Sequence, residues 1–423
     1  MEMNDMILVS TDDHIIEPAD MFDDRMPAKF KDQAPKMTQL PNGVDTWEFC
    51  GQNAGAIGVG AVASWPKEEW GMDPVGHAEM RPGCYDIDAR VRDMDANGIA
   101  ASLNFPTMAG FSGHYLANVP DKELASAAIR AYNDWHIDEW CGSYPGRFIP
   151  LSILSLYDPE EMAREIRRVA VKGCTAVTLP EVPYLLNLPS FGSDYWEPVF
   201  KAACDTDTVL CLHIGLAINI IPNPDGFQPG RLIIMGAQMT AMTFNDLLSN
   251  GVFARFPTLK VALSEGGIGW IPFYMDRADR HVEQHVWTDV PGASEMLPSE
   301  VLQKNTLGCF ITDRSSLRIR DRIGVDSIAW ECDYPHSDST WPLSPEMLWD
   351  ELKEAECTDE EIHKITWQNS CRFFRFDLTK HRPFAEWTVG ALRASATDVD
   401  VSETSKAQYR ERYEARHATT VDA

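Results

Sequence analysis

Near its N-terminus the chain reads Asp12-Asp13-His14-Ile15-Ile16-Glu17-Pro18, two residues after the apolar run Met6-Ile7-Leu8-Val9. Short apolar runs bounded by turn residues are typical of strands. Side chains alternate between the two faces of a strand, so Asp12 and His14 point the same way. The sequence therefore predicts a first strand that ends with a carboxylate beside an imidazole. Alone, such an Asp-x-His pair would equally fit a helix cap or an ordinary turn.

Further apolar runs follow, and segments with helical spacing separate them. The runs lie at residues 99–105, 147–155, 174–179, 208–213, 259–264, 308–312 and 327–332. Strands that alternate with helices predict an α/β fold with a parallel sheet, and eight such units can close as a (β/α)8 TIM-type barrel. The alternative is a doubly wound open sheet. Its dinucleotide-binding form carries a Gly-rich loop where this chain has Asp12-x-His14.

The predicted barrel covers residues 1–376, with an insertion at 30–83 after the first strand and a C-terminal extension at 377–423. The insertion is rich in Gly, Pro and Trp, and its residues 46–50 read as a short strand. The extension is charged and poor in core periodicity. We therefore expect it to be a partner-wrapping or mobile segment.

Composition narrows the class of protein. The 423 residues carry a formal net charge of −27, which disfavours nucleic-acid binding, because that depends on Lys and Arg. No run approaches the roughly 20 apolar residues of a membrane span, and no signal peptide is visible, so we expect a cytoplasmic protein without a membrane partner. The ten cysteines are scattered without a C-x-x-C pair, which predicts neither a disulfide framework nor a zinc finger.

Candidate metal ligands recur at the ends of the predicted strands. In a barrel the C-terminal strand ends converge on one pocket, so these side chains should meet. Carboxylates packed together raise one another's pKa, and a cation removes that cost. A mixture of histidine and carboxylate ligands favours iron, manganese or zinc. Seven candidate ligands are more than one tetrahedral zinc can use, which favours two metals. The predicted metal site comprises Asp12, His14, Glu17, His213, Glu265, Asp333 and His336.

Each of these residues also has an ordinary structural interpretation. His213 alone would fit a hydrogen-bonded core histidine, Glu265 a turn and Asp333 a loop cap. His281 and His285 are four apart and could share a helix face. A solvated face is the commoner outcome for such a pair, so it is left out of the predicted site.

The chain resembles the amidohydrolase-related family that includes aminocarboxymuconate-semialdehyde decarboxylase and the dihydroxybenzoate decarboxylases. The resemblance covers roughly residues 6–376 and rests on Asp12-x-His14-x-x-Glu17-Pro18, on Asp333-Tyr334-Pro335-His336 and on the run 251–270. It implies a metal-dependent TIM barrel. Those decarboxylases typically carry a catalytic His at the end of strand six, where this chain has Glu265. The resemblance assigns no role to His336. Dinuclear hydrolases of the wider superfamily often use a modified Lys at the end of strand four. Residues 177–180, at the end of that predicted strand, contain no Lys.

With these departures the pattern looks more like a TIM-barrel branch of non-haem diiron monooxygenases of the platensimycin-biosynthesis type. That resemblance implies two Fe ions, dioxygen and hydroxylation of a small organic substrate, with acyl-CoA esters as candidates. One alternative is a metal-dependent amidohydrolase-type hydrolase or decarboxylase with one Zn or Mn, in which His336 or Glu265 is the catalytic base. Another is a metal-stabilised binding protein. The oligomeric state stays open, a homo-oligomer included.

Two segments are expected to cover the site, because long connections tend to carry function. These are the connection at 215–236 and the insertion at 30–83. Three aromatic side chains there fit either an apolar pocket or local core packing: Trp65, Trp70 and Phe227. Two basic side chains fit either an anionic substrate or solvent: Arg231 and Lys67.

Overall fold

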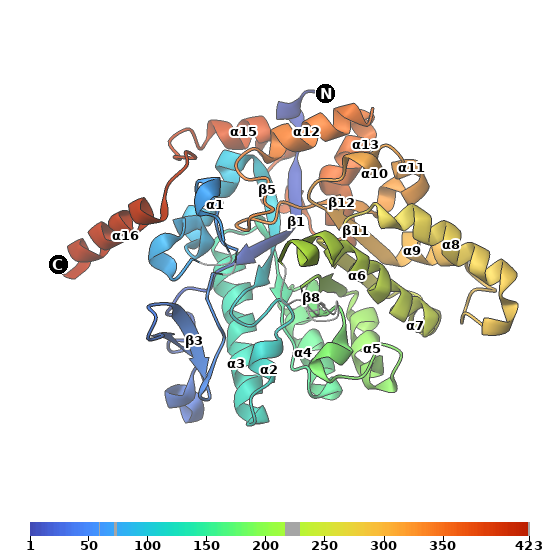
Figure 1. Cartoon of the computed structure of the whole chain (residues 1–423), viewed down its shortest axis with the longest axis horizontal. Coiled ribbons are helices and arrows are strands. Elements are labelled where there is room, and N and C mark those ends of the chain that lie inside the picture. Colours follow the sequence, from blue (N-terminus) through green and yellow to red (C-terminus); the bar gives the residue numbers. More distant parts are fainter. Residues whose placement is uncertain (59, 72–73, 216–228, 422–423) are drawn as a thin grey trace.

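Parallel strands surrounded by helices form the centre of the computed structural model, which describes residues 1–58, 60–71, 74–215 and 229–421 (Figure 1). The barrel strands are β1 (Leu8–Ile15), β5 (Ile99–Pro106), β6 (Phe148–Ile149), β7 (Leu151–Ser152), β8 (Ala176–Pro180), β9 (Val209–His213), β10 (Lys260–Ser264), β11 (Thr306–Phe310) and β12 (Ile328–Trp330). β6 and β7 are two parts of one strand position. Pro150 splits them, because proline has no amide proton for the ladder.

These strands form two hydrogen-bonded sheets that meet along two seams. One sheet holds β1, β5 and β6, and the other runs in the order β7, β8, β9, β10, β11, β12. The first seam lies at Pro150. At the second, the amide of Asp333 donates to the carbonyl of Asp12 at 2.8 Å, and that of His14 to the carbonyl of Tyr334 at 2.6 Å. The chain after β12 thus returns to β1. The predicted TIM-type barrel is confirmed, and the open-sheet alternative is wrong.

The outer layer consists mainly of the helices that follow the strands. Side chains of Asp86, Asp121 and Asp158 accept backbone amides at the first turns of α1, α3 and α4, as N-caps do. Among the described residues, no helix has the length and apolar character of a bilayer-spanning segment. The helices are α1 (Ile87–Asn97), α2 (His114–Ala117), α3 (Lys122–Trp135), α4 (Pro159–Val171), α5 (Glu197–Thr206), α6 (Pro229–Ser249), α7 (Val252–Arg255), α8 (Trp270–Gln284), α9 (Pro298–Asn305), α10 (Arg314–Leu317), α11 (Arg320–Ile323), α12 (Ser344–Glu354), α13 (Asp359–His363) and α14 (Asn369–Phe374).

The insertion after β1 contains a small antiparallel sheet beside the barrel (Figure 1). Its strands are β2 (Lys36–Gln39), β3 (Asp45–Phe49) and β4 (Gln52–Asn53). Trp65 is 2% exposed, which fits the core-packing alternative, whereas Trp70 is 38% exposed. The Lys67 ammonium lies 5.5 Å from the Trp70 ring.

The predicted connection at 215–236 is shorter than expected. Helix α6 already begins at Pro229, because proline suits the first turn of a helix. Phe227 and the side chain of Arg231 lie outside the described residues.

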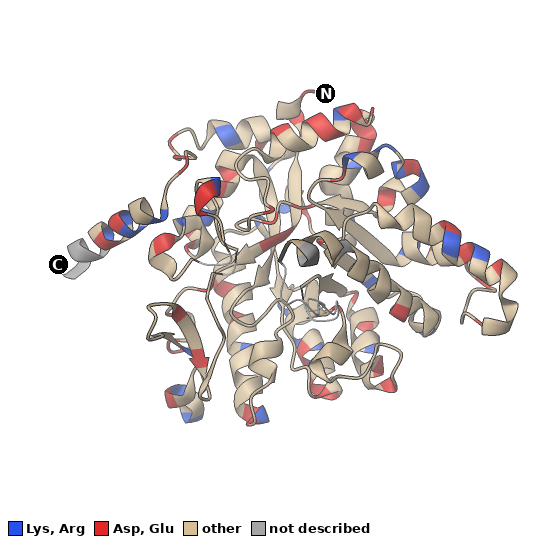
Figure 2. Ribbon diagram, in the orientation of Figure 1, with Lys and Arg blue, Asp and Glu red and all other residues tan. Residues whose placement is uncertain are grey.

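Part of the C-terminal extension packs beside the start of β1. Trp387 and Val389 are fully buried, and the amide of Val389 donates to the carbonyl of Met6 at 2.8 Å. The expected mobile or partner-wrapping character is therefore wrong for this part, because a few apolar side chains without clear periodicity meet the barrel. The extension also contains α15 (Val389–Ala394) and α16 (Lys406–Val421). α16 projects from the body and carries interspersed acidic and basic residues (Figures 1 and 2). The boundary at 376/377 stays a prediction.

Candidate metal centre

Six polar side chains meet at the carboxyl ends of the strands. β1 supplies Asp12 and His14, and β9 ends in His213. The turn after β10 supplies Glu265, and the segment after β12 supplies Asp333 and His336. Their ligand atoms form two groups, each within 4.8 Å, that share His14 and Glu265. The first group is Asp12, His14, His213 and Glu265, and the second is His14, Glu265, Asp333 and His336.

Nε2 of His14 lies at the middle of this cluster. It is 3.1 Å from Nε2 of His213 and 3.4 Å from a carboxylate oxygen of both Asp12 and Asp333. The other oxygen of Asp12 is 3.2 Å from Nε2 of His213. Two imidazole nitrogens that face each other this closely repel, unless a proton or a cation lies between them.

Neighbouring groups orient two of the imidazoles. Nδ1 of His213 donates to the carbonyl of Ile214, so its Nε2 presents a lone pair to the cluster. Nδ1 of His336 lies 2.9 Å from Oδ1 of Asp333. Metal-binding histidines in proteins are commonly held in the same way, by a carbonyl or carboxylate on the nitrogen that does not bind the metal.

Buried atoms without partners indicate that the cluster is built for a cation. Both carboxylate oxygens of Asp12 are buried and have no hydrogen-bond partner among the described residues. Each such atom costs about 1–3 kcal/mol. A divalent cation would satisfy them, and a mixture of imidazole and carboxylate donors suits manganese or zinc. The residues present therefore fit a metal ion.

Electrostatics support the same conclusion. Burial, reinforced by neighbouring carboxylates, raises the pKa of Asp12 well above its ordinary value. Burial and then the charge of Asp333 raise the pKa of Glu265 to about 8. Burial lowers the pKa of the imidazoles of His14, His213 and His336. Without a cation the folded site favours neutral acids and neutral imidazoles, whereas a bound cation holds its carboxylate ligands ionised.

The backbone turns sharply where two of the carboxylates leave their strands. Glu265 has φ 53° and Asp333 has φ 60°, in the left-handed region that non-glycine residues seldom adopt. Such strain persists where the surroundings fix it and is concentrated at functional sites. At Glu265 one fixing contact is visible, because its amide donates to Oε1 of Glu331 at 3.0 Å.

Glu17 does not join the cluster, which contradicts its predicted role as a ligand. Its carboxylate accepts the amides of Thr107 at 3.0 Å and Met108 at 2.8 Å, and the hydroxyl of Tyr132 at 3.1 Å. The reason is that β1 ends at Ile15, so the alternation that aligns Asp12 and His14 does not extend to residue 17. Glu17 instead ties the end of β1 to the segment after β5.

Two buried acids around the cluster escaped the sequence prediction. Glu331 is fully buried, and its Oε2 has no partner among the described residues. Its position directly after β12 was a usable signal, because the other members of the cluster also lie at or just after strand ends. Asp13 accepts the amide of Tyr334 at 2.9 Å and thereby holds the segment that carries Asp333 and His336. Burial raises the pKa of Asp13 to about 6.

Access to the cluster is one-sided. The side chains of Asp12 and His14 are completely buried, whereas those of Glu265 and His336 are 17% and 13% exposed. Phe111 forms a wall, with its ring centroid 4.7 Å from that of His14 and 4.5 Å from that of His213. A substrate would therefore reach the centre from the side of Glu265 and His336.

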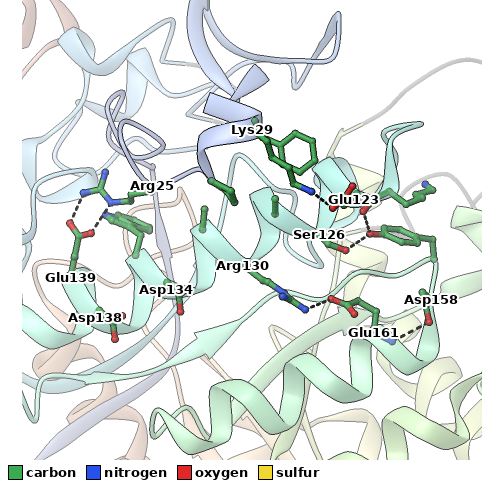
Figure 3. A pocket seen from close by; sticks show the side chains of 17 residues that line it. Arg25, Lys29, Glu123, Ser126, Arg130, Asp134, Asp138, Glu139, Asp158 and Glu161 are labelled. Carbon is green, nitrogen blue, oxygen red and sulfur yellow. Dashed lines mark hydrogen bonds and ion pairs between the residues drawn. The ribbon is translucent and has the colours of Figure 1, made fainter. Parts of the chain in front are cut away.

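A cavity of about 830 Å³ lies elsewhere, between the segment after β1 and α3 (Figure 3). None of the six cluster residues lines it. Its charged walls pair with each other: Arg25 with Glu139, Lys29 with Glu123, and Arg130 with Glu161. These pairs leave little uncompensated charge for a ligand, so this cavity is a solvated surface cleft.

Comparison with known proteins assigns the family. A family model described as amidohydrolase matches residues 38–376. The chain belongs to this amidohydrolase family. Curated relatives of this amidohydrolase include a gamma-resorcylate decarboxylase of Polaromonas, 26% identical, with 73% of this chain and 96% of the relative covered. Another is the 2-amino-3-carboxymuconate-6-semialdehyde decarboxylase of Dictyostelium discoideum, 23% identical, with 72% and 80% covered.

Solved structures of the same fold resemble this amidohydrolase. An amidohydrolase from Mycobacterium avium subsp. paratuberculosis superposes with a TM-score of 0.68 at 21% identity, covering 87% of this chain and 99% of the other. A 5-carboxyvanillate decarboxylase from Novosphingobium aromaticivorans, complexed with manganese, gives a TM-score of 0.59 at 19% identity, with 88% and 97% covered. At these identities the structures bear on the fold alone.

The predicted diiron monooxygenase is wrong. The curated relatives are decarboxylases, which are lyases and not oxidoreductases. Two Fe ions, dioxygen and acyl-CoA depended on that resemblance and lose their support with it. The broader prediction, an amidohydrolase-related barrel with a metal site, is the part that holds.

Proposed function

We propose that this amidohydrolase is a metal-dependent decarboxylase of a small aromatic acid. The observation that carries the proposal is the buried cluster of imidazoles and carboxylates with unpartnered atoms, in a family whose curated relatives here are decarboxylases. Loss of CO2 leaves an electron pair on carbon. The site must therefore hold the carboxylate, stabilise negative charge and deliver a proton.

The exposure of each side chain suggests which residue holds the metal and which delivers the proton. Asp12, His14 and His213 are the innermost donors, and Glu265 completes the first group of ligand atoms. We assign these four to a single divalent cation, manganese or zinc. When bound there, such a cation supplies Lewis-acid stabilisation of oxygen on the substrate.

His336 is the best-placed proton donor. It lies on the exposed side, Asp333 is 2.9 Å from its Nδ1, and Nε2 has no partner among the described residues. A positioned imidazole is the commonest general acid in enzymes. As the C–C bond to CO2 breaks, its electron pair stays on the substrate carbon, which takes a proton from the imidazolium form of His336. His336 is left as a neutral imidazole and regains its proton from solvent on its exposed side. The decarboxylases that the sequence resembles typically carry an imidazole at the end of strand six, and His336 would supply it from strand eight instead.

The wall of the site suits a flat substrate. Phe111 is half-buried against His14 and His213, and Phe105 lies behind, with its ring centroid 4.8 Å from that of His213. Aromatic pairs favour offset or edge-to-face contact at such separations. A benzoate ring stacked near Phe111 would present its carboxylate to the inner donors.

The test is CO2 release by protein loaded with Mn2+ or Zn2+, using hydroxybenzoic acids as substrates. We expect turnover, with one deuterium incorporated at the vacated carbon in D2O. His336→Asn should lower kcat by about 100-fold or more, because general acid catalysis contributes on that order. The matched control is His281→Asn on α8. Hydrolysis of amides or esters by the same loaded protein, without CO2 release from any acid, would overturn the proposal.

A further inference from the structure

The end of the chain holds part of the insertion from outside. Helix α16 lies near the end of the chain (Figure 1). Its Tyr409 is 4% exposed and packs with Val62 and Trp65 in a small apolar cluster. The Tyr409 hydroxyl hydrogen-bonds Oγ of Ser64. The amide of Thr404 donates to the carbonyl of Ser64 at 2.8 Å. Segment 60–65 is therefore covered by residues more than 300 positions away in the chain.

Polar contacts fix the start of α16 on the same surface. Arg410 forms an ion pair with Glu79, which is 2% exposed. The amide of Lys406 donates to a carboxylate oxygen of Glu69 at 2.8 Å, and its ammonium lies 4.4 Å from the Trp65 ring. Cation–π contacts of this kind add stability even at partly exposed sites. Several independent contacts thus determine where Tyr409 lies.

The inner side of segment 60–65 lies against the proposed proton donor. The amides of Val62 and Ala63 both donate to the carbonyl of Pro335, at 3.0 and 3.1 Å. Gly60 has φ 73°, and a Cβ built there would lie 3.5 Å from Cδ2 of His336. The segment therefore hydrogen-bonds the residue before His336, and at Gly60 only the space of one side-chain atom separates it from the imidazole.

We propose that Tyr409 is a positioning residue for His336 and acts through segment 60–65. With the Tyr409 ring in place, the segment is packed between α16 and Pro335. Without it, the segment loses the apolar contacts of Val62 and Trp65 with the ring and the hydrogen bond to Ser64, and it opens locally more often. The catalytic part of this inference rests on the proposed function, because His336 is the proton donor only there. The mechanical part, which is that Tyr409 holds segment 60–65 in place, does not rest on the proposed function.

The experiment uses the full-length protein loaded with Mn2+ and compares Tyr409→Ala, Tyr409→Phe and the exposed control Glu411→Ala. Hydrogen exchange is followed at the amides of Val62 and Ala63. We expect exchange about tenfold faster in Tyr409→Ala, near wild type in Tyr409→Phe because the ring remains, and unchanged in the control. Exchange in β8–β10 should not change. Wild-type exchange at Val62 and Ala63 in Tyr409→Ala would overturn the inference.

Activity then tests the link to His336. We expect kcat of Tyr409→Ala to fall about tenfold with KM within about twofold, and Tyr409→Phe to restore most of it. Faster exchange with an unchanged kcat would overturn the positioning role. If the wild type releases no CO2, the proposed function fails, and the exchange data still decide the mechanical part. Should Tyr409→Ala not fold, Arg410→Gln removes the ion pair to Glu79 alone and is expected to speed exchange about threefold.

Discussion

Stripping the metal should make the stability of this protein fall as pH rises, and Glu265 should account for much of the fall. Its pKa is about 8 in the folded cluster, against an ordinary value of 4.5. Between these values the folded protein binds more protons than the unfolded chain, so raising the pH favours unfolding. The imidazoles of the cluster have lowered pKa values and would oppose this trend only below their ordinary value of 6.5.

The size of this loss of stability follows from the pH range over which Glu265 is protonated in the folded protein but ionised in the unfolded chain. Between about pH 6.5 and about pH 8 each pH unit costs about 1.4 kcal/mol, so the Glu265 carboxyl alone should remove about 2 kcal/mol from the free energy of unfolding. Glu265→Gln holds no titratable proton and should lose this slope. Glu283→Gln, on the exposed face of α8, should keep it. Saturating Mn2+ should abolish or reverse the slope, because the cation requires the ionised carboxylate.

The assay is urea unfolding in chelator at several pH values, repeated with Mn2+. The informative quantity is the difference in slope between wild type and Glu265→Gln, because contributions from other buried acids such as Glu17 cancel in it. Equal slopes for these two proteins in chelator would refute the reasoning. So would an unchanged slope when Mn2+ is added at saturation.

Three further substitutions test the remaining structure. His213→Ala should weaken Mn2+ binding on the order of 100-fold by calorimetry, with His281→Ala as the unaffected control; equal affinities would remove His213 from the site. Glu17→Ala leaves three donors without an acceptor and should cost about 2–4 kcal/mol in urea unfolding, while metal content stays constant. Trp387→Ala should cost about 3–5 kcal/mol with Mn2+ affinity kept, whereas the exposed Phe384→Ala should cost far less; similar costs would contradict the burial of Trp387.

The barrel could be predicted because its strands are short apolar runs with clear boundaries. The split at Pro150 was missed, although proline inside a strand is a known interruption of the ladder. The start of α6 was placed too late, because Gly and Pro are frequent in residues 215–230 and resemble a loop. The burial of Trp387 depends on tertiary contacts that no local pattern encodes.

The candidate site was predictable to the extent that its ligands follow strand ends. Asp12, His14 and His213 meet for that reason, whereas Glu17 lies past the end of β1 and turns to other partners. Glu331 was not predicted because it lies inside the predicted strand 327–332, and only residues after the predicted strand ends were considered there. The chemistry was not predictable from the ligands, since one set of imidazoles and carboxylates can serve oxygenation, hydrolysis or decarboxylation.

The two seams of the barrel bear on when the protein can acquire its ion during synthesis. Asp12 and His14 belong to the sheet of β1, β5 and β6, whereas His213 and Glu265 come from the other sheet or the turn after it. A cation held by both would join the two sheets across the C-terminal end of the barrel. On the ribosome, the early ligands emerge long before the late ones. If these four residues hold the ion, its binding would have to follow the synthesis of both sheets.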